Sequence, residues 1–212
     1  SSGPRASIES FEQYREVLTT CIQIFEDVES ASQPWHLMAQ STGCAISMDY
    51  LLRLPSSQHS NPFNELIFFA PLVRPVNWRV SSAMHSAGKY FIKSQKRVFT
   101  QNSNDAAFLQ FVREHDPLQP VILSLQWVTA LKQWLKEFHK LPESELSPLV
   151  IQGKVDGTVD WQYNIPKIQG KFKQSQVHYS DEGRHHLVNE SKPIRNEIFK
   201  LVDNIINPPP AQ

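Results

Sequence analysis

Apolar residues recur at three- and four-residue steps near both ends of the chain, and this spacing predicts amphipathic helices there. A helical pattern also follows residue 41. The expected helices cover residues 11–29, 42–53 and 194–206. The second one is followed by Leu54-Pro55, where proline disfavours a further helical turn. Helices are therefore expected near both ends of the sequence and in its first quarter.

Short apolar runs lie between these helices and have the length of buried strands. They cover residues 35–39, 66–70 and 149–153, and a weaker run covers residues 176–179. Strands that alternate with helices along a chain favour a parallel sheet with helices on both faces. The predicted fold class is therefore α/β.

Residues 75–147 interrupt this alternation. The interval is rich in serine, glutamine, lysine and aromatic residues, and it has no clear strand. Leu125, Val128, Leu131 and Leu135 fall on one helical face. We interpret the interval as a mainly helical insertion, which is either a lid over a site or a set of ordinary packing helices. The core of the α/β fold then consists of residues 1–74 and 148–212.

Composition and charge narrow the classes of function. The 212 residues are 40% hydrophobic, and 21 basic residues balance 21 acidic ones. A neutral chain has no electrostatic footprint for nucleic acid, and no apolar run approaches the length of a membrane span. The two cysteines, Cys21 and Cys44, are too few for a disulfide framework. We expect both to be buried free thiols in a reducing, cytoplasmic compartment, with peripheral membrane contact as the remaining possibility.

The strongest candidate for chemistry is the pentapeptide Ala39-Gln40-Ser41-Thr42-Gly43. It is a variant of G-x-S-x-G, in which small residues flank a strained serine because a strand and a helix approach closely at the turn. The pentapeptide alone is a weak signal. An apolar run before it and a helical pattern after it provide the strand–turn–helix context that the motif requires.

Partners for such a serine follow in the order acid, then histidine. Asp156 comes just after the third apolar run, at the carboxyl edge where ligands of parallel sheets bind, and Asp160 is its rival. His185 and His186 come after the weak fourth run. The alternative is that Asp156 is a turn residue and His185 a surface histidine. A metal site on the paired histidines has less support, because adjacent residues rarely ligate one ion and no third ligand is suitably spaced.

Four blocks of the sequence, in order, resemble the α/β-hydrolase superfamily, and within it the bacterial lysophospholipases and monoacylglycerol lipases often labelled serine aminopeptidase-like. "AQSTGCAISMDYLLR" resembles the nucleophile elbow of that group, and "LIFFAPLVRP" the next strand with its exit. "LVIQGKVDGTVD" resembles the acid turn and "EGRHHLVNE" the histidine turn. "HDPLQP" with "LQWVTALKQW" resembles the lysophospholipase insertion. The likeness extends from about residue 3 to residue 206.

The resemblance implies a role for each site residue. Ser41 would be the nucleophile, Asp156 the orienting acid and His185 the base, and the main-chain N–H of Thr42 would be an oxyanion donor. No metal or organic cofactor is implied. Gln40 and Cys44 depart from the usual histidine and glycine of the elbow and are expected to alter the pocket without removing the mechanism.

The same resemblance places the start of this sequence after the early strands and the His-Gly loop of the group. We therefore expect an incomplete sheet, with an open edge or an unusual partner on the elbow strand and with no second oxyanion donor near Ser41. We also expect these residues alone to be poorly soluble and inactive.

The activity implied by the resemblance is hydrolysis of carboxylic esters, as in a lysophospholipase or monoacylglycerol lipase, through an acyl-enzyme. The alternatives are a peptidase or another esterase on the same triad, and a non-catalytic protein of this fold. The aromatic residues of the insertion are candidates for an acyl-chain pocket, although at least half of them are expected to form its own core. They are Trp78, Phe91, Phe108, Phe111, Trp127 and Trp134.

Overall fold

Four parallel strands form the main sheet of the computed structural model, which describes residues 6–28, 34–55, 61–88, 94–96 and 100–208. The strand order is β1-β2-β5-β6, and each strand pairs in parallel with its neighbour. The predicted α/β class and the four predicted strands are confirmed. The strands are β1 (His36–Gln40), β2 (Glu65–Phe69), β5 (Leu149–Gly153) and β6 (Gln176–Ser180).

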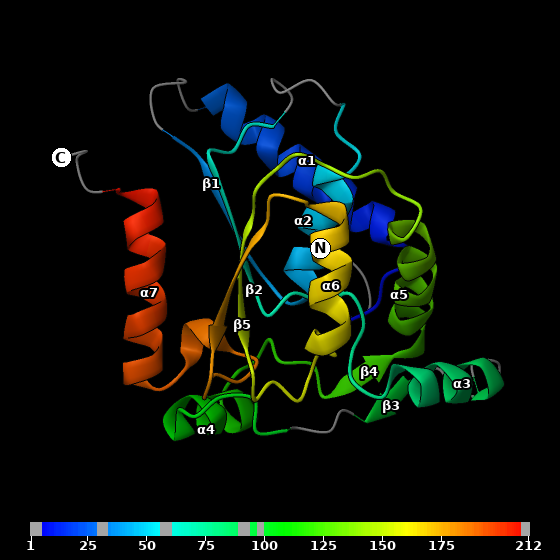
Figure 1. Ribbon diagram of the computed structural model, residues 1–212. Coiled ribbons are helices and arrows are strands. Elements are labelled where there is room, and N and C mark those ends of the chain that lie inside the picture. Colours follow the sequence, from blue (N-terminus) through cyan, green and yellow to red (C-terminus); the bar gives the residue numbers. More distant parts are fainter. Residues whose placement is uncertain (1–5, 29–33, 56–60, 89–93, 97–99, 209–212) are drawn as a thin grey trace.

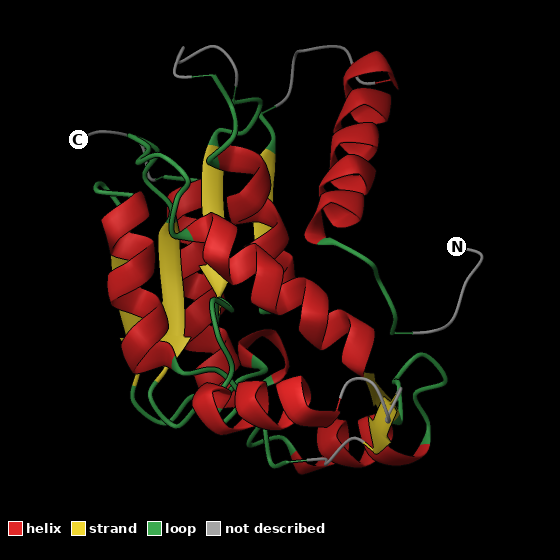
Figure 2. Ribbon diagram, turned by 90° about the vertical axis from the view of Figure 1, so that its right-hand side faces the viewer, coloured by secondary structure: helices red, strands yellow, loops and turns green. Residues whose placement is uncertain are grey.

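Helices cover both faces of this sheet (Figures 1 and 2). The three helices expected from the sequence are present, as α1, α2 and α7, within a few residues of their expected ends. The helices, in chain order, are α1 (Phe11–Val28), α2 (Thr42–Leu51), α3 (Trp78–Gly88), α4 (Ala106–Glu114), α5 (Leu125–Phe138), α6 (Trp161–Lys171) and α7 (Lys192–Ile206).

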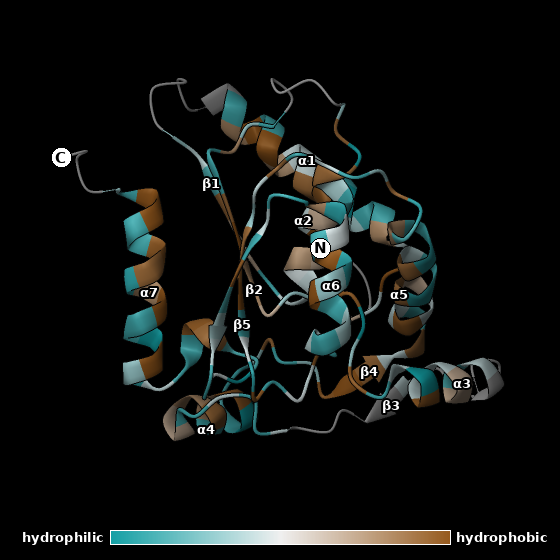
Figure 3. Cartoon of the chain, viewed as in Figure 1, coloured by the Kyte–Doolittle hydropathy of each residue, from teal (hydrophilic) through white to brown (hydrophobic). Residues whose placement is uncertain are grey.

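The two central strands are apolar on both faces because each face is covered. Leu66 and Phe68 of β2 belong to the larger core cluster, with residues from α2, α5 and α6. Ile67 and Phe69 alternate with them and belong to a second cluster, under α7. Figure 3 shows the hydrophobic side of α7 turned toward the sheet. The continuous apolar run in the sequence thus reflects a strand buried on both sides.

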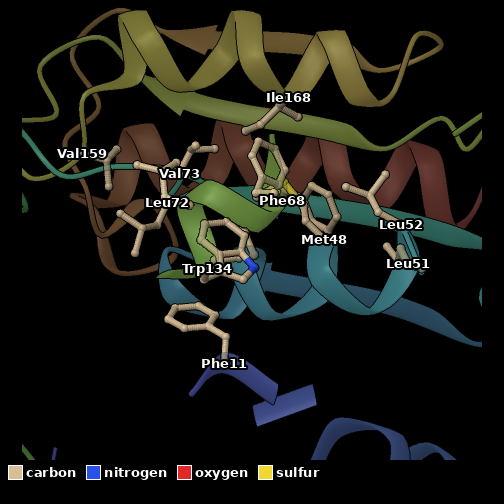
Figure 4. Close-up of a cluster of buried hydrophobic side chains, with 14 of the residues drawn as sticks. Phe11, Met48, Leu51, Leu52, Phe68, Leu72, Val73, Trp134, Val159 and Ile168 are labelled. Atoms are coloured by element: carbon tan, nitrogen blue, oxygen red, sulfur yellow. The ribbon is translucent and has the colours of Figure 1, made fainter. Parts of the chain in front are cut away.

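Helix α5 belongs to the body of the protein although it lies within residues 75–147. Its Trp134 is almost fully buried and stacks on Phe11 of α1, with ring centroids 5.0 Å apart. Phe138 packs against the same indole at 5.1 Å. Figure 4 shows Trp134 between Phe11 and the side chains of β2 and α2. This aromatic group joins α1 and α5 to the larger core cluster.

A second group of elements from this interval lies near the carboxyl ends of the sheet strands (Figure 1). It contains α3, α4 and a two-stranded antiparallel sheet of β3 (Ser94–Lys96) and β4 (Ile122–Ser124). The expectation that this interval has no strand is therefore wrong. Each strand has three residues, which is too short for an alternating pattern, and pairing between distant segments creates both of them.

Helix α6 has no counterpart among the elements expected from the sequence. Asp160 caps it by accepting a hydrogen bond from the main-chain N–H of Tyr163, and Ile165 and Ile168 are buried. Pro166 lies inside the helix, which weakens the sequence signal because proline usually interrupts one.

Strand β1 lies at an edge of the sheet, and in the described part of the chain it pairs with β2 alone. An open edge on this strand agrees with the expectation from the sequence. The expectation that the strand is buried on both faces is wrong, because the side chain of Met38 is 45% exposed. The expected burial of both thiols is also wrong, since Cys44 is buried but Cys21 is exposed on α1.

Candidate active site

Ser41 occupies the sharp turn between β1 and α2. Its φ of 54° and ψ of −115° are strained for a residue with a side chain. The turn is held on both sides, because the Ser41 N–H donates to the Phe69 carbonyl at 3.0 Å and the Ser41 carbonyl accepts from Leu72 N–H at 3.2 Å. A β-carbon on Gly43 would lie 3.8 Å from that of Ala39, which is ordinary contact. Alanine at the first small position of the motif is therefore compatible with the turn.

His185 connects Ser41 to Asp156. The Nε2 atom of His185 lies 2.9 Å from Ser41 Oγ, and its Nδ1 atom lies 2.9 Å from Asp156 Oδ2. His185 and Asp156 are both buried. The structure thus brings together the three side chains selected from the sequence, in the geometry of a nucleophile, a base and an orienting carboxylate.

The carboxylate of Asp156 is fully engaged. Oδ1 accepts the main-chain N–H groups of Thr158 at 2.7 Å and Val159 at 3.1 Å. Oδ2 accepts the side-chain amide of Gln152 at 3.2 Å in addition to His185. Burial alone would raise the pKa of Asp156, but the hydrogen bond and charge of His185 and the two main-chain donors outweigh it and lower that pKa. The carboxylate therefore remains ionised beside the imidazole.

Asp160, the rival acid, has a different task. It caps α6 and forms an ion pair with Arg74, whose guanidinium approaches to 2.6 Å. Its side chain is therefore committed to the junction between α6 and the segment after β2.

His186 turns away from Ser41. Its Nδ1 atom lies 3.1 Å from Gln40 Nε2, and its ring contacts Phe108 of α4 with centroids 5.3 Å apart. Gln40, the residue that departs from the usual elbow sequence, is thus accommodated by His186. In the described part of the chain, no group of three or more His, Cys, Asp or Glu side chains is arranged to hold a metal ion.

Thr42 is the first residue of α2. The first N–H groups of a helix have no partner within the helix and carry a partial positive charge. Because Thr42 directly follows Ser41, the main-chain N–H that the sequence selects as an oxyanion donor lies at the N-terminus of this helix.

Two glycines allow the acid turn and the histidine turn to touch, a feature that the sequence analysis missed. A β-carbon on Gly153 would lie 2.3 Å from the carbonyl oxygen of Gly183, and one on Gly183 would lie 2.8 Å from Ser180 Oγ. The N–H of Val155 donates to the same Gly183 carbonyl at 3.0 Å. The glycines in the two motifs "QGKVD" and "EGRHH" were the available signal.

A cavity of about 450 Å³ opens elsewhere on the protein, between the end of α2, the start of β2 and residues 142–147. These segments lie at the amino ends of β2 and β5, whereas Ser41 follows the carboxyl end of β1. The cavity is therefore separate from the Ser41 site.

The fold and this site define a class of protein, the α/β hydrolases with a serine nucleophile elbow. Residues 1–192 match the family described as serine aminopeptidase, S33, and the chain belongs to that family. A comparison with curated protein sequences finds no match.

Solved structures of similar fold include two lipases and an esterase. A monoacylglycerol lipase from Paleococcus ferrophilus superposes with a TM-score of 0.73 at 13% identity, over 94% of this chain and 76% of that one. A soluble variant of monoglyceride lipase from Saccharomyces cerevisiae gives 0.71 at 14% identity, over 93% and 68%. An esterase from Exiguobacterium antarcticum gives 0.59 at 13% identity, over 95% and 75%. At these identities the likeness establishes the α/β-hydrolase fold.

Among the described residues, no helix has both the length and the apolar character needed to cross a membrane.

Proposed function

We propose that this chain is a serine hydrolase that cleaves carboxylic esters, of the lysophospholipase or monoacylglycerol lipase type. The observation that carries the proposal is the continuous contact from Ser41 through His185 to Asp156, each step at 2.9 Å. The strained turn under Ser41 supports it, because such a turn holds the hydroxyl clear of the sheet.

In this mechanism Ser41 Oγ attacks the acyl carbonyl while His185 Nε2 takes its proton. Asp156 keeps the proton of the neutral imidazole on Nδ1, so that Nε2 is free to accept, and it stabilises the imidazolium that forms. The N–H of Thr42 donates to the oxyanion. His185 then returns the proton to the leaving alcohol, and water, activated by the same histidine, hydrolyses the acyl-enzyme.

The substrate class is supported by the surroundings of the site. Two of the similar solved structures are described as monoacylglycerol or monoglyceride lipases. We propose that residues 75–88, 94–96 and 100–124 form a cap over the site and that α5 belongs to the body. Large exposed apolar side chains are concentrated in that cap, for example Leu118 at 77% and Met84 at 66%, which favours peripheral contact with lipid in a cytoplasmic protein.

Some of the aromatic candidates for an acyl-chain pocket fit the cap better than others. Trp134 is part of the body core, and Trp78 and Trp127 pack against it. Phe108 contacts His186 beside the site, whereas Phe111 is exposed. Phe91 lies outside the described residues. Phe108 is therefore our candidate for an acyl-chain contact.

A peptidase is the second candidate, because the family itself is described as a serine aminopeptidase. The two activities share the triad and differ in the leaving group. A panel of p-nitrophenyl esters of increasing acyl length, run beside aminoacyl anilides, separates them. Preference for the anilides would replace the ester proposal.

Labelling with a fluorophosphonate tests whether Ser41 is the nucleophile. Ser41→Ala should abolish labelling of the parent chain, taken as the full-length protein, whereas Ser47→Ala should leave it intact. Ser47 is a matched control because its hydroxyl lies in the same helix region and is committed to the Gly43 carbonyl at 2.9 Å. Labelling that persists in Ser41→Ala would contradict the assignment. A parent chain that is folded but not labelled would favour the non-catalytic alternative.

A further inference from the structure

A fully buried carboxylate lies beside the histidine turn and takes no part in the mechanism above. It belongs to Glu190, between the short 3-10 helix η2 (Leu187–Asn189) and α7. Its Oε1 atom accepts the main-chain N–H of Arg184 at 2.8 Å, and its Oε2 atom accepts those of Asn104 at 2.9 Å and Ser191 at 3.0 Å. The side-chain amide of Asn104 adds a longer contact at 3.4 Å.

These donors come from three separate segments. Arg184 directly precedes His185, Ser191 is the residue before the first turn of α7, and Asn104 belongs to the segment that leads into α4. Figure 1 shows α4 close to the chain between β6 and α7. Glu190 therefore links the main chain of Arg184, next to the base His185, to the cap at Asn104 and to the start of α7.

Other hydrogen bonds follow the same junction between residues 101–105 and the histidine turn. The hydroxyl of Ser103, which is fully buried, donates to the Asn189 carbonyl at 2.7 Å. The N–H of His186 donates to the Asn102 carbonyl at 2.8 Å. Residues 102–104 of the cap thus form hydrogen bonds with the histidine turn at His186 and at Asn189, as well as with the carboxylate of Glu190.

The N–H groups around Glu190 require that both of its side-chain oxygens accept hydrogen bonds. An ionised carboxylate is acceptor-only and offers about four lone-pair positions, which matches the N–H groups that converge on Glu190. A glutamine of the same shape would turn an NH₂ group toward one or two of these donors. It would leave buried N–H groups unsatisfied, and the turn would have to move to relieve this.

We propose that Glu190 is a positioning residue for His185. By holding the Arg184 N–H against the cap segment, it fixes the turn whose imidazole must reach both Ser41 and Asp156. A displacement of about 1 Å in such a group can cost about 100-fold in rate. The position of His185 therefore depends on how the segment before α4 packs against the histidine turn. The inference rests on the proposed function, because it assigns a role within the same site.

The first test compares Glu190→Gln with Glu182→Gln. Both changes remove one carboxylate near His185, but Glu182 is exposed and contributes its main-chain carbonyl to Asn104 Nδ2 at 2.9 Å, which glutamine retains. On the ester that the parent cleaves best, Glu190→Gln should lower kcat by about 10- to 100-fold with KM within about threefold. The rate of fluorophosphonate labelling should fall in parallel, and Glu182→Gln should behave as the parent.

A second pair of variants covers the case in which Glu190→Gln does not fold. Asn104→Ala removes the side-chain contacts of an exposed residue, whereas Asn102→Ala retains the main-chain carbonyl that His186 uses. Asn104→Ala should lower kcat several-fold, and Asn102→Ala should not.

The low-field proton resonance of His185 Nδ1, assigned by its loss in His185→Gln, reports the same effect without a substrate. It should broaden or shift in Glu190→Gln and Asn104→Ala and remain unchanged in the two controls. A normal resonance and a parental kcat in a less stable Glu190→Gln would show that Glu190 is merely structural and would overturn the inference. Failure of the parent to label would instead contradict the proposed function, and the resonance would still test the positioning.

Discussion

Replacement of Asp156 by asparagine is the most informative single change, because the structure dictates how the new amide must sit. The two main-chain donors, Thr158 and Val159, point at Oδ1 and require an oxygen there. The NH₂ group of asparagine must then occupy the position of Oδ2. That position faces His185 Nδ1 at 2.9 Å and the amide of Gln152 at 3.2 Å.

An NH₂ group at this position reverses the hydrogen bond to the histidine. His185 Nδ1 would become the acceptor, so the neutral ring would carry its proton on Nε2, the atom that faces Ser41. In that tautomer the ring cannot accept the serine proton. We therefore expect Asp156→Asn to lower kcat by about 10⁴-fold at neutral pH with little change in the position of the side chains.

The assay is ester turnover together with the rate of fluorophosphonate labelling, and Asp160→Asn is the matched control. Asp160 is in the same region of the chain, but it caps α6 and pairs with Arg74. Asp160→Asn should reduce the free energy of unfolding by only about 1 kcal/mol, because both side chains of the Arg74–Asp160 pair are partly exposed. It should leave kcat within a few-fold of the parent. A value of kcat within tenfold of the parent for Asp156→Asn would refute the tautomer argument.

The same variant has a consequence for stability against pH. The pKa of Asp156 is lowered in the folded state, because its hydrogen bonds and the charge of His185 outweigh burial. A carboxyl with a depressed folded pKa contributes stability in full above its unfolded pKa of about 3.9, and this contribution is lost as the pH falls through the folded value. Asp156→Asn should therefore show a shallower loss of stability in urea titrations below about pH 4 than the parent does.

The remaining predictions concern the base and the two turns. His185→Ala should lower kcat for a p-nitrophenyl ester by several orders of magnitude. His186→Ala should lower it far less, because the His186 ring faces Gln40, and similar losses for both variants would contradict the choice of base. Gly153→Ala should destabilise the fold by at least about 1–3 kcal/mol in urea unfolding, because its methyl group would overlap the carbonyl oxygen of Gly183. Gly170→Ala in α6 meets open space and should instead stabilise by about 0.5–1 kcal/mol, and equal effects at the two glycines would show that the close approach of the turns is not needed.

Local sequence patterns predict most strands of the main sheet and the order of its elements along the chain. The runs that became β2 and β5 are continuous and apolar because both faces of those strands are covered. The helices that became α1 and α7 carry one apolar stripe each, whereas α2 is buried around most of its circumference. The motif around Ser41 depends on small residues at fixed offsets, which is also a local property. For these reasons the sequence alone predicts the α/β class and the order of serine, acid and histidine.

Contacts between segments that are distant in the sequence determine which acid joins the site and where the remaining elements form. The choice of Asp156 over Asp160 depends on which carboxylate meets His185, and Arg74, far away in the sequence, engages Asp160. Strands β3 and β4 exist only as a pair, and α6 contains a proline that hides it from periodicity.

The carboxylate of Glu190 gives the same lesson within the site. In the sequence it is the last residue of the block "EGRHHLVNE", and no local pattern indicates which groups it meets. Only the fold brings the N–H groups of Asn104, Arg184 and Ser191 to its two oxygens. Local patterns specify elements because they depend on neighbouring residues, whereas a hydrogen-bonded junction depends on where the folded chain returns, and this is fixed by packing of the whole core.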